Sequence, residues 1–159
     1  WDPGMMANGM LAGLVAITAP CAFVNSLSAV IIGVIAGLLV IFAAFFVEKN
    51  LKIDDPVGAF AVHGANGFWG VLSLGLFADG SYGDGWNGVP GTVKGLFYGD
   101  PKQFLAELIG GLTCFIFVFI VMYLFFKICA KTSIGLRSDA ADEIAGLDIP
   151  EMGVHGYVD

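Results

Sequence analysis

The chain alternates long apolar stretches with short polar ones. Four apolar stretches predict helices at residues 5–24, 27–47, 56–78 and 104–126. Each approaches the roughly 20 residues that a helix needs to cross a hydrocarbon core about 30 Å thick. Residues 48–55 are mostly charged and predict a short loop in water, and the glycine-rich residues 79–91 predict a surface loop. This pattern predicts an all-α polytopic membrane protein, with four transmembrane helices within residues 1–130.

Small residues mark one side of the first two predicted helices. Gly9 and Gly13 lie four residues apart, and Gly33 and Gly37 repeat this spacing. Because lipid tails are as apolar as the side chains, membrane helices associate by close backbone approach at small residues. The two glycine pairs therefore predict faces on which these helices pack.

Composition agrees with a membrane protein. Hydrophobic residues make up 57% of the 159 residues and charged residues 13%, whereas soluble domains have about 25% charged residues. The mean hydropathy is +0.83. The net charge is −7, and the acidic residues lie mainly in loops and the C-terminal region. No basic patch is present in the sequence, so we expect no nucleic-acid partner and instead a chain embedded in the lipid bilayer.

The cysteines and the first residues bear on processing. Cys21, Cys114 and Cys129 are odd in number, have no CxxC spacing and lie in or beside apolar segments. We expect small buried packing residues rather than a disulfide or a metal site. The first apolar run lacks a basic region and a cleavage site, so it is not expected to be a signal peptide. A chain that opens on Trp1 is expected to be a fragment or a processed piece.

Basic residues predict the orientation, because lysine and arginine gather on the cytoplasmic side of a membrane. With four spans, the loop after the second span and the C-terminal region share one side. That side carries five basic residues against two in the opposite loop, namely Lys49, Lys52, Lys127, Lys131 and Arg137 against Lys94 and Lys102. Residues 131–159 are therefore predicted to form a cytoplasmic tail, and the third helix to enter from the cytoplasm.

His63 is the main functional candidate. We expect Asp55 to cap the third helix and Pro56 to occupy its first position. His63 would then lie about 10 Å into the membrane, at 1.5 Å per residue. An ionisable residue at such a depth is costly and is by default a functional hypothesis.

The neutral form of His63 should dominate in a medium of low dielectric constant. A neutral imidazole can bind a small polar solute, pass a proton or ligate a metal. Further metal ligands are not spaced for it in the predicted spans, so no metal is expected. The alternative is a histidine that is hydrogen-bonded inside a packed bundle. Gly64, Gly67 and Gly70 give the helix a nearly bare surface, which suits either a narrow pore or tight packing.

Glu107 is a weaker candidate. It lies near the start of the fourth predicted span, where interfacial water can reach it. We expect a solvated carboxylate there rather than a functional one.

Several motifs resemble one family in the same order along the chain. Residues 54–64, followed by residues 67–70, resemble the tenth transmembrane helix of the Amt/Mep/Rh ammonium transporter family. Residues 11–20 resemble its eighth helix, and residues 99–103 resemble the run into its eleventh. The cytoplasmic tail of the family is matched by two short motifs, and these favour the Amt/Mep branch: Gly135, Leu136 and Arg137, and Gly146, Leu147 and Asp148.

The resemblance implies helices 8 to 11 of an eleven-helix fold with two inverted repeats, assembled as a homotrimer in the plasma (inner) membrane with one pore per subunit. It implies that His63 is one of a pair of pore-lining histidines, the other lying on sequence outside this chain. The implied activity is transport of ammonium, which loses its proton and passes as ammonia, with the proton following a separate route. Gly58 departs from relatives that carry an aspartate at that position.

For the tail, the resemblance implies a regulatory element that packs on a neighbouring subunit, and PII signalling proteins as partners at the cytoplasmic mouth. Ser138 or Asp139 is predicted to cap a short helix ending at Gly146, and Arg137 to anchor the bend through its planar donor fork. The alternative is an acidic surface that only aids solubility. Pro150 lies near the place of a regulatory threonine in plant members, so that phosphorylation switch is not expected.

Two other function classes remain. An ammonium sensor would use the same fold to pass binding to an attached signalling domain. A membrane enzyme with His63 as its base would need a nucleophile or a metal site, which the sequence does not show, so we expect no enzyme and no cofactor. His155 is expected to be a surface residue.

Overall fold

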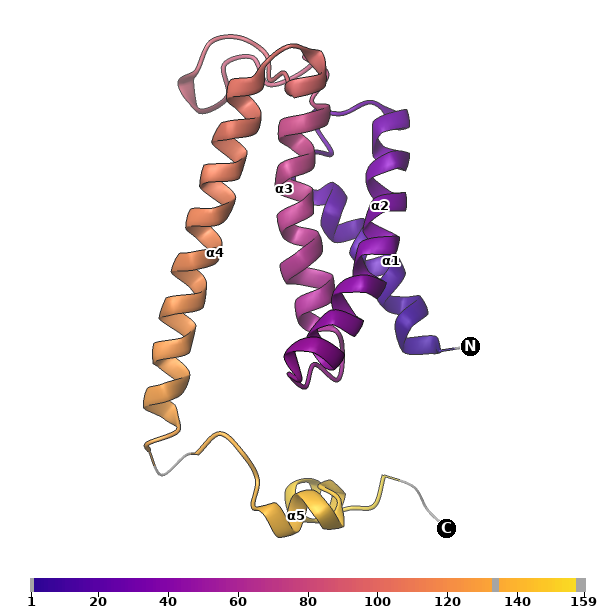
Figure 1. The fold of residues 1–159 in the computed structure, drawn as a ribbon, viewed down its shortest axis with the longest axis vertical. Coiled ribbons are helices and arrows are strands. Elements are labelled where there is room, and N and C mark those ends of the chain that lie inside the picture. The colour runs from indigo at the N-terminus through magenta and orange to yellow at the C-terminus, as the bar shows by residue number, and fades with distance from the viewer. Residues whose placement is uncertain (1, 133–134, 157–159) are drawn as a thin grey trace. The chain divides into compact units, whose positions relative to one another are not determined.

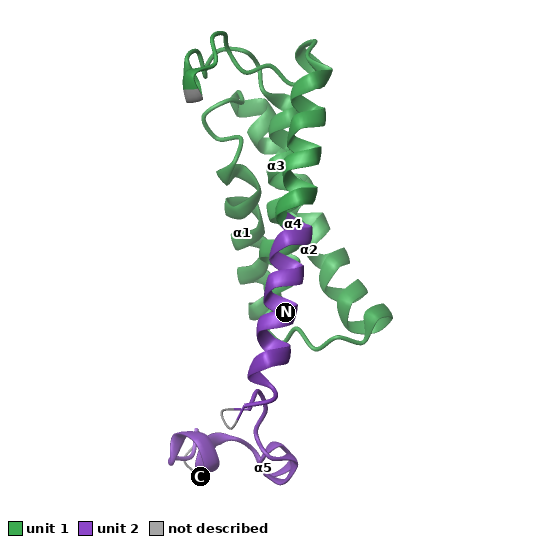
Figure 2. Ribbon diagram, turned by 90° about the vertical axis from the view of Figure 1, so that its left-hand side faces the viewer, with its two compact units in different colours: residues 1–114 green, residues 115–159 purple. Residues whose placement is uncertain are grey.

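The computed structural model describes residues 2–132 and 135–156, and for Asn87 the backbone alone. Trp1 and the predicted tail residues 133–134 and 157–159 lie outside the described part. The chain divides into two compact units, residues 1–114 and 115–159 (Figure 2).

The described elements are helical, and the predicted all-α class is confirmed. An isolated bridge pairs Asp79 with Lys94. In chain order the α-helices are α1 Pro3–Thr18, α2 Ser26–Phe45, α3 Asn66–Phe77, α4 Pro101–Cys129 and α5 Ala140–Ala145. The π-helices are η1 Phe46–Leu51, η2 Phe60–Ala65 and η5 Asp148–Met152, and the 3₁₀-helices are η3 Trp86–Gly88 and η4 Leu96–Tyr98.

Three helices among the described residues are long and apolar enough to cross a membrane. They are the continuous segments Ser26–Leu51, Phe60–Phe77 and Pro101–Cys129. The first predicted span was set at residues 5–24, but α1 has only 16 residues and ends at Thr18. Pro20 explains the early end, because proline has no N–H to donate to the carbonyl of Ala16 one turn back.

Helices α1, α2 and α3 form the core of the first unit, and successive helices run in opposite directions (Figure 1). One stripe of α2 is buried at a spacing of three or four residues, which is the period of a helix face. It packs against Ala12 and Ala16 of α1 and against Ala61 and Val62 of η2. The indole Nε1 of Trp69 donates to the carbonyl of Ile32 at 3.2 Å and links α3 to α2.

The glycine pairs do not form these interfaces. A Cβ added at Gly9, Gly13, Gly33 or Gly37 would meet no atom of another element within 4 Å. The prediction that these glycines mark packed faces is therefore wrong within this chain. On α1 the packing contacts with α2 are made by Ala12 and Ala16 instead. A methyl group is small enough for the helices to approach closely and adds contact area that glycine lacks.

The first polar connection differs from the prediction, whereas the second is a mostly exposed loop, as predicted. Helix α2 continues as the π-helix η1 to Leu51, so the helical backbone extends into the predicted water-side loop at residues 48–55. Lys52 then ends the helix in a left-handed conformation with φ of 55°. The second connection, the loop at residues 79–91 that follows α3, contacts Phe23 at two points. The N–H of Asp79 donates to the carbonyl of Phe23 at 2.9 Å, and the ring of Trp86 packs edge-on against the ring of Phe23.

The first turns of α4 belong to the first unit and pack on α3. A Cβ added at Gly75 would lie 2.8 Å from the Cα of Phe104, and one added at Gly111 would lie 3.0 Å from the ring of Phe68. The second unit contains the rest of α4 and the tail with α5 and η5. The apolar side chains of α4 in this unit are exposed, except for the half-buried Cys129.

Candidate functional site

The segment that carries His63 is a π-helix, and a carboxylate closes its first turn. Asp55 accepts hydrogen bonds from the backbone N–H groups of Ala59 at 2.7 Å and Phe60 at 2.9 Å. The Asp55 carboxylate therefore binds the first N–H groups of the helix, but the N-cap position is occupied by Ala59 rather than by Asp55 as predicted. Pro56 lies in a turn before the helix rather than at its first position. That prediction is wrong, and His63 lies in the first turn of the helix instead of two turns in.

Gly58 makes this entry turn possible. Its φ is +69°, a left-handed conformation that glycine adopts without the steric cost of a side chain. A Cβ at Gly58 would lie 2.6 Å from Nδ2 of Asn8, whose amide donates to the carbonyl of Val57 at 3.1 Å. The start of the third helix is thus bound to α1.

The imidazole of His63 is exposed on the first unit. It is the sole ionisable side chain between Pro56 and Ala78. An imidazole on an apolar helix can donate and accept hydrogen bonds and can exchange a proton with a partner. The described residues leave it accessible to a solute or to a segment outside the chain.

Asn66 closes the other end of the same π-helix. Its Nδ2 donates to the carbonyl of Ala61 at 2.9 Å, and its backbone N–H donates to the carbonyl of His63. The side chain is fully buried, and its Oδ1 has no hydrogen-bond partner in the described part of the chain. Sequence reasoning missed Asn66. A polar amide three residues after His63 in an apolar helix was the available signal.

The three glycines after His63 have different surroundings. A Cβ at Gly70 would lie 2.7 Å from the carbonyl oxygen of Ala16, so α1 and α3 approach each other there through their backbones. At Gly64 it would lie 2.8 Å from the ring of Phe60 on the same π-helix, and at Gly67 the nearest atom, on Val15, is 3.9 Å away. Gly70 serves packing between α1 and α3, Gly64 makes room for the ring of Phe60, and Gly67 has only a van der Waals neighbour on Val15.

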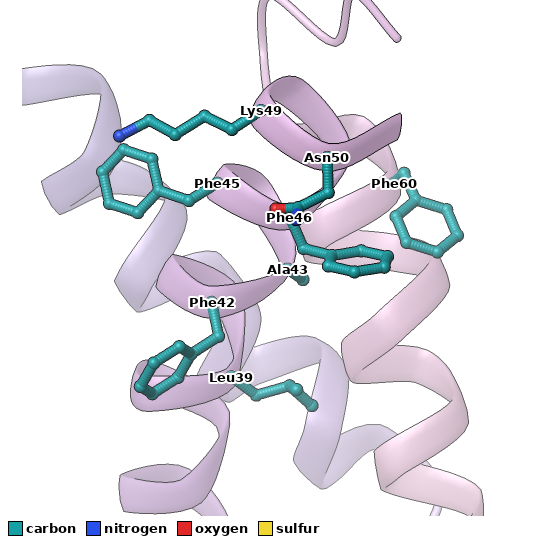
Figure 3. Close-up of a pocket in the computed structure, with 8 residues that line it drawn as sticks. All are labelled: Leu39, Phe42, Ala43, Phe45, Phe46, Lys49, Asn50 and Phe60. Carbon is teal, nitrogen blue, oxygen red and sulfur yellow. The ribbon is translucent and has the colours of Figure 1, made fainter. Parts of the chain in front are cut away.

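An apolar hollow of about 580 Å³ lies beside the end of α2 (Figure 3). His63 does not line it. Its one cation, the Nζ of Lys49, lies 4.6 Å from the centre of the Phe45 ring on the same helical segment. The residues around the hollow are Leu39, Phe42, Ala43, Phe45, Phe46, Lys49, Asn50 and Phe60.

Other candidates fall outside the His63 region. No cluster of three or more potential metal ligands occurs among residues 2–132 and 135–156. Cys21 and Cys114 are exposed free thiols, so the prediction of buried packing residues is wrong for them within this chain. Glu107 is half-buried and its Oε1 accepts from Nε2 of Gln103 at 2.7 Å, so it is less solvated than predicted.

The tail contains the predicted short helix. Helix α5 begins after Asp139 and ends before Gly146, whose φ is 100°. The side chain of Asp139 makes no capping bond. Arg137 donates through Nε and Nη2 to the carboxylate of Glu143, at 3.0 and 2.8 Å, so Glu143 is paired rather than only solvated.

Two further contacts close the tail on itself. The Ser138 hydroxyl donates to the Glu151 carboxylate, and the N–H of Gly156 donates to Oδ2 of Asp148 at 2.9 Å. The N–H of Gly135 donates to the carbonyl of Thr132 at 3.3 Å, and the carbonyl of Leu147 accepts from the N–H of Glu151 at 3.0 Å. Leu136 is exposed, and so is His155, as predicted. The tail motifs therefore lie on one small folded segment.

Comparison with known proteins gives one consistent family. Residues 1–157 match the Ammonium Transporter Family. The chain is 45% identical to the ammonium transporter Amt2 of Archaeoglobus fulgidus over 156 residues, which is 98% of this chain and 33% of the relative. It is 35% identical to the ammonium transporter of Bacillus subtilis, over 96% of this chain and 36% of the relative.

Solved structures agree. The fold is similar to that of Saccharomyces cerevisiae Mep2, with a TM-score of 0.74, 27% identity, and coverage of 86% of this chain and 30% of that chain. Candida albicans Mep2 matches with a TM-score of 0.72 and 26% identity over 86% of this chain and 30% of its own. The chain thus spans about a third of the length of the relatives that it matches.

Proposed function

We propose that this chain, which belongs to the ammonium transporter family, forms part of a membrane path for ammonium. Its apolar helices and its family make it a multi-pass membrane protein. Its relatives are named as ammonium transporters, not as enzymes. Because it spans about a third of their length, other segments would complete the path.

The observation that carries the proposal is the exposed imidazole of His63 on an otherwise uncharged apolar helix. Moving a bare cation out of water is costly, whereas a small neutral molecule crosses apolar surroundings at much lower cost. A pore that carries nitrogen as ammonia therefore needs a group that can exchange hydrogen bonds and protons inside the membrane. His63 would be that group, paired with a second histidine from sequence outside this chain.

The surrounding features fit the same role. Gly67 leaves the helix surface open one turn after the imidazole, Gly64 makes room for the ring of Phe60, and Gly70 lets α3 approach α1 closely. The path would run through each subunit of a homotrimer in the plasma membrane. By the distribution of basic residues, the tail would lie on the cytoplasmic side.

The tail would be the regulatory element. Arg137, Glu143 and Asp148 hold it in a folded form that could pack on a neighbouring subunit. Its acidic surface would meet a PII signalling protein at the cytoplasmic mouth.

Uptake of labelled methylammonium by the full-length protein in sealed vesicles tests the proposal. Saturable uptake that ammonium competes with is the expected result. Binding of the label without entry into the vesicle would contradict transport and favour the sensor.

A further inference from the structure

We propose that Asn66 is a positioning residue for His63: it holds the π-helix η2 in the form that presents the imidazole. The importance of His63 for transport rests on the proposed function above. The positioning itself rests on the geometry of residues 61–66.

Two hydrogen bonds from one residue define the end of the π-helix. The side-chain Nδ2 of Asn66 reaches back five residues to the carbonyl of Ala61 at 2.9 Å, and the backbone N–H bonds the carbonyl of His63 itself. A carbonyl oxygen can only accept, so the amide nitrogen must face Ala61 and Oδ1 must point the other way. Asn66 therefore fixes the backbone on both sides of Val62, directly at the residue that carries the imidazole.

Stability alone does not explain an asparagine at this place. Its side chain is 0% exposed and its Oδ1 is unpaired in the described part of the chain. Burying an unpaired polar atom destabilises the folded state, and asparagine is a poor residue for a helix interior. An apolar side chain would avoid both costs but would give up the bond to Ala61.

The π-helical geometry of η2 explains why a buried asparagine stands at position 66. π-helices are rare and short because their backbone packing is poorer than that of an α-helix, and they cluster at functional sites. Asp55 supports the N-terminal turn of η2 and Asn66 supports the C-terminal turn. Without Asn66, the segment can relax to an α-helix, which would rotate His63 about the helix axis.

Ser73 offers a matched control two turns further along α3. It is also 0% exposed, and its Oγ donates to the backbone carbonyl of Gly70 at 2.7 Å. It resembles Asn66 in burial and in bonding to its own helix. It differs in lying outside η2 and ten residues from His63 in sequence.

The test uses the full-length protein with ¹⁵N-labelled histidine rings, in which the His63 signals are assigned by their loss in His63→Ala. Asn66→Leu keeps a similar volume and removes the unpaired oxygen, so the protein is expected to fold. Asn66→Ser is the second variant, because a serine hydroxyl reaches back only three or four residues. In both, we expect the His63 ring signals to shift or broaden, and Ser73→Ala to leave them unchanged.

Unchanged His63 signals in Asn66→Leu and Asn66→Ser, or equal shifts in Ser73→Ala, would overturn the positioning role. Methylammonium uptake by the same variants distinguishes a failure of the positioning role of Asn66 from a failure of the proposed transport function. We expect uptake to fall roughly tenfold or more in the Asn66 variants, as for a misplaced reacting group. If His63→Ala retains full uptake, the transport role of His63 fails, while shifted signals in the Asn66 variants still support positioning.

Discussion

The third and fourth apolar segments are both long enough to cross a membrane, yet they are built differently. In Phe60–Phe77, 39% of the residues are buried, the helix begins as a π-helix, and His63, Asn66 and Ser73 interrupt the apolar surface. In α4, a regular helix runs for 29 residues and none of them is buried. Irregular backbone and buried polar groups are costly in a membrane, so they indicate where a helix does more than span it.

The same difference appears in the use of glycine. Gly70 lies where a Cβ would be 2.7 Å from a backbone oxygen of α1. In α4, Gly111 approaches only the side-chain ring of Phe68, and a Cβ at Gly110 would meet no atom of another element within 4 Å. The third segment is therefore specified by contact with its neighbours. The exposed part of α4 requires only apolar side chains.

The largest expected difference in stability is between alanine substitutions at one glycine of the third segment and one glycine of α4. Gly70→Ala should destabilise the protein by about 1–3 kcal/mol, because the methyl group forces two backbones apart. Gly110→Ala should be neutral or stabilising by up to about 1 kcal/mol, because alanine favours helix. Thermal unfolding of the full-length protein in detergent measures both. Equal melting temperatures for the two variants would contradict the statement that close backbone contact specifies the third segment but not α4.

A smaller effect is expected at the entry to η2. Asp55→Ala removes the acceptor for the N–H groups of Ala59 and Phe60 and should cost about 1 kcal/mol, as for the loss of a helix cap. Asp54→Ala is the matched control, since Asp54 is exposed. Denaturation of both variants under the same conditions is the measurement, and similar losses would show that the carboxylate of Asp55 does not support the π-helix.

The smallest effect is expected in the tail. Arg137 and Glu143 form a two-pronged ion pair, but their side chains are 79% and 37% exposed. Glu143→Gln should therefore lower stability by less than about 1 kcal/mol. The effect should appear as faster proteolysis of the tail with unchanged melting of the helices. A lowered melting temperature of the whole protein would mean that the tail supports the membrane segments.

The sequence predicted the features that depend on composition and side-chain period. These include the apolar segments, the role of the Asp55 carboxylate in binding the first N–H groups of the third segment, and the tail helix ending at Gly146. Pro20 indicated that α1 ends early, but the apolar residues after it led to a predicted helix that continues to residue 24. The stretch around His63 could be recognised from the sequence because an imidazole in an apolar helix is costly.

The remaining features depend on which backbone groups meet. A π-helix shifts the hydrogen bonds by one residue and leaves almost no trace in the hydrophobic pattern, so η1 and η2 were not foreseen. The side-chain bond from Asn66 to Ala61 spans five residues, the same separation as a π-helical backbone bond. For the same reason, Gly70 could not be distinguished from Gly9 or Gly13, although only Gly70 among these three meets another backbone closely.

The most direct test of the central claim compares one residue from each segment in a transport assay. His63 lies on the irregular third segment, and Phe117 is a 65% exposed side chain of α4. Methylammonium uptake is measured for His63→Ala and Phe117→Ala in the full-length protein reconstituted in lipid vesicles. We predict that His63→Ala lowers uptake by about tenfold or more, as expected for the loss of a proton-exchanging group, and that Phe117→Ala transports like the parent protein. Parent-like uptake by His63→Ala, or an equal loss in Phe117→Ala, would contradict the account.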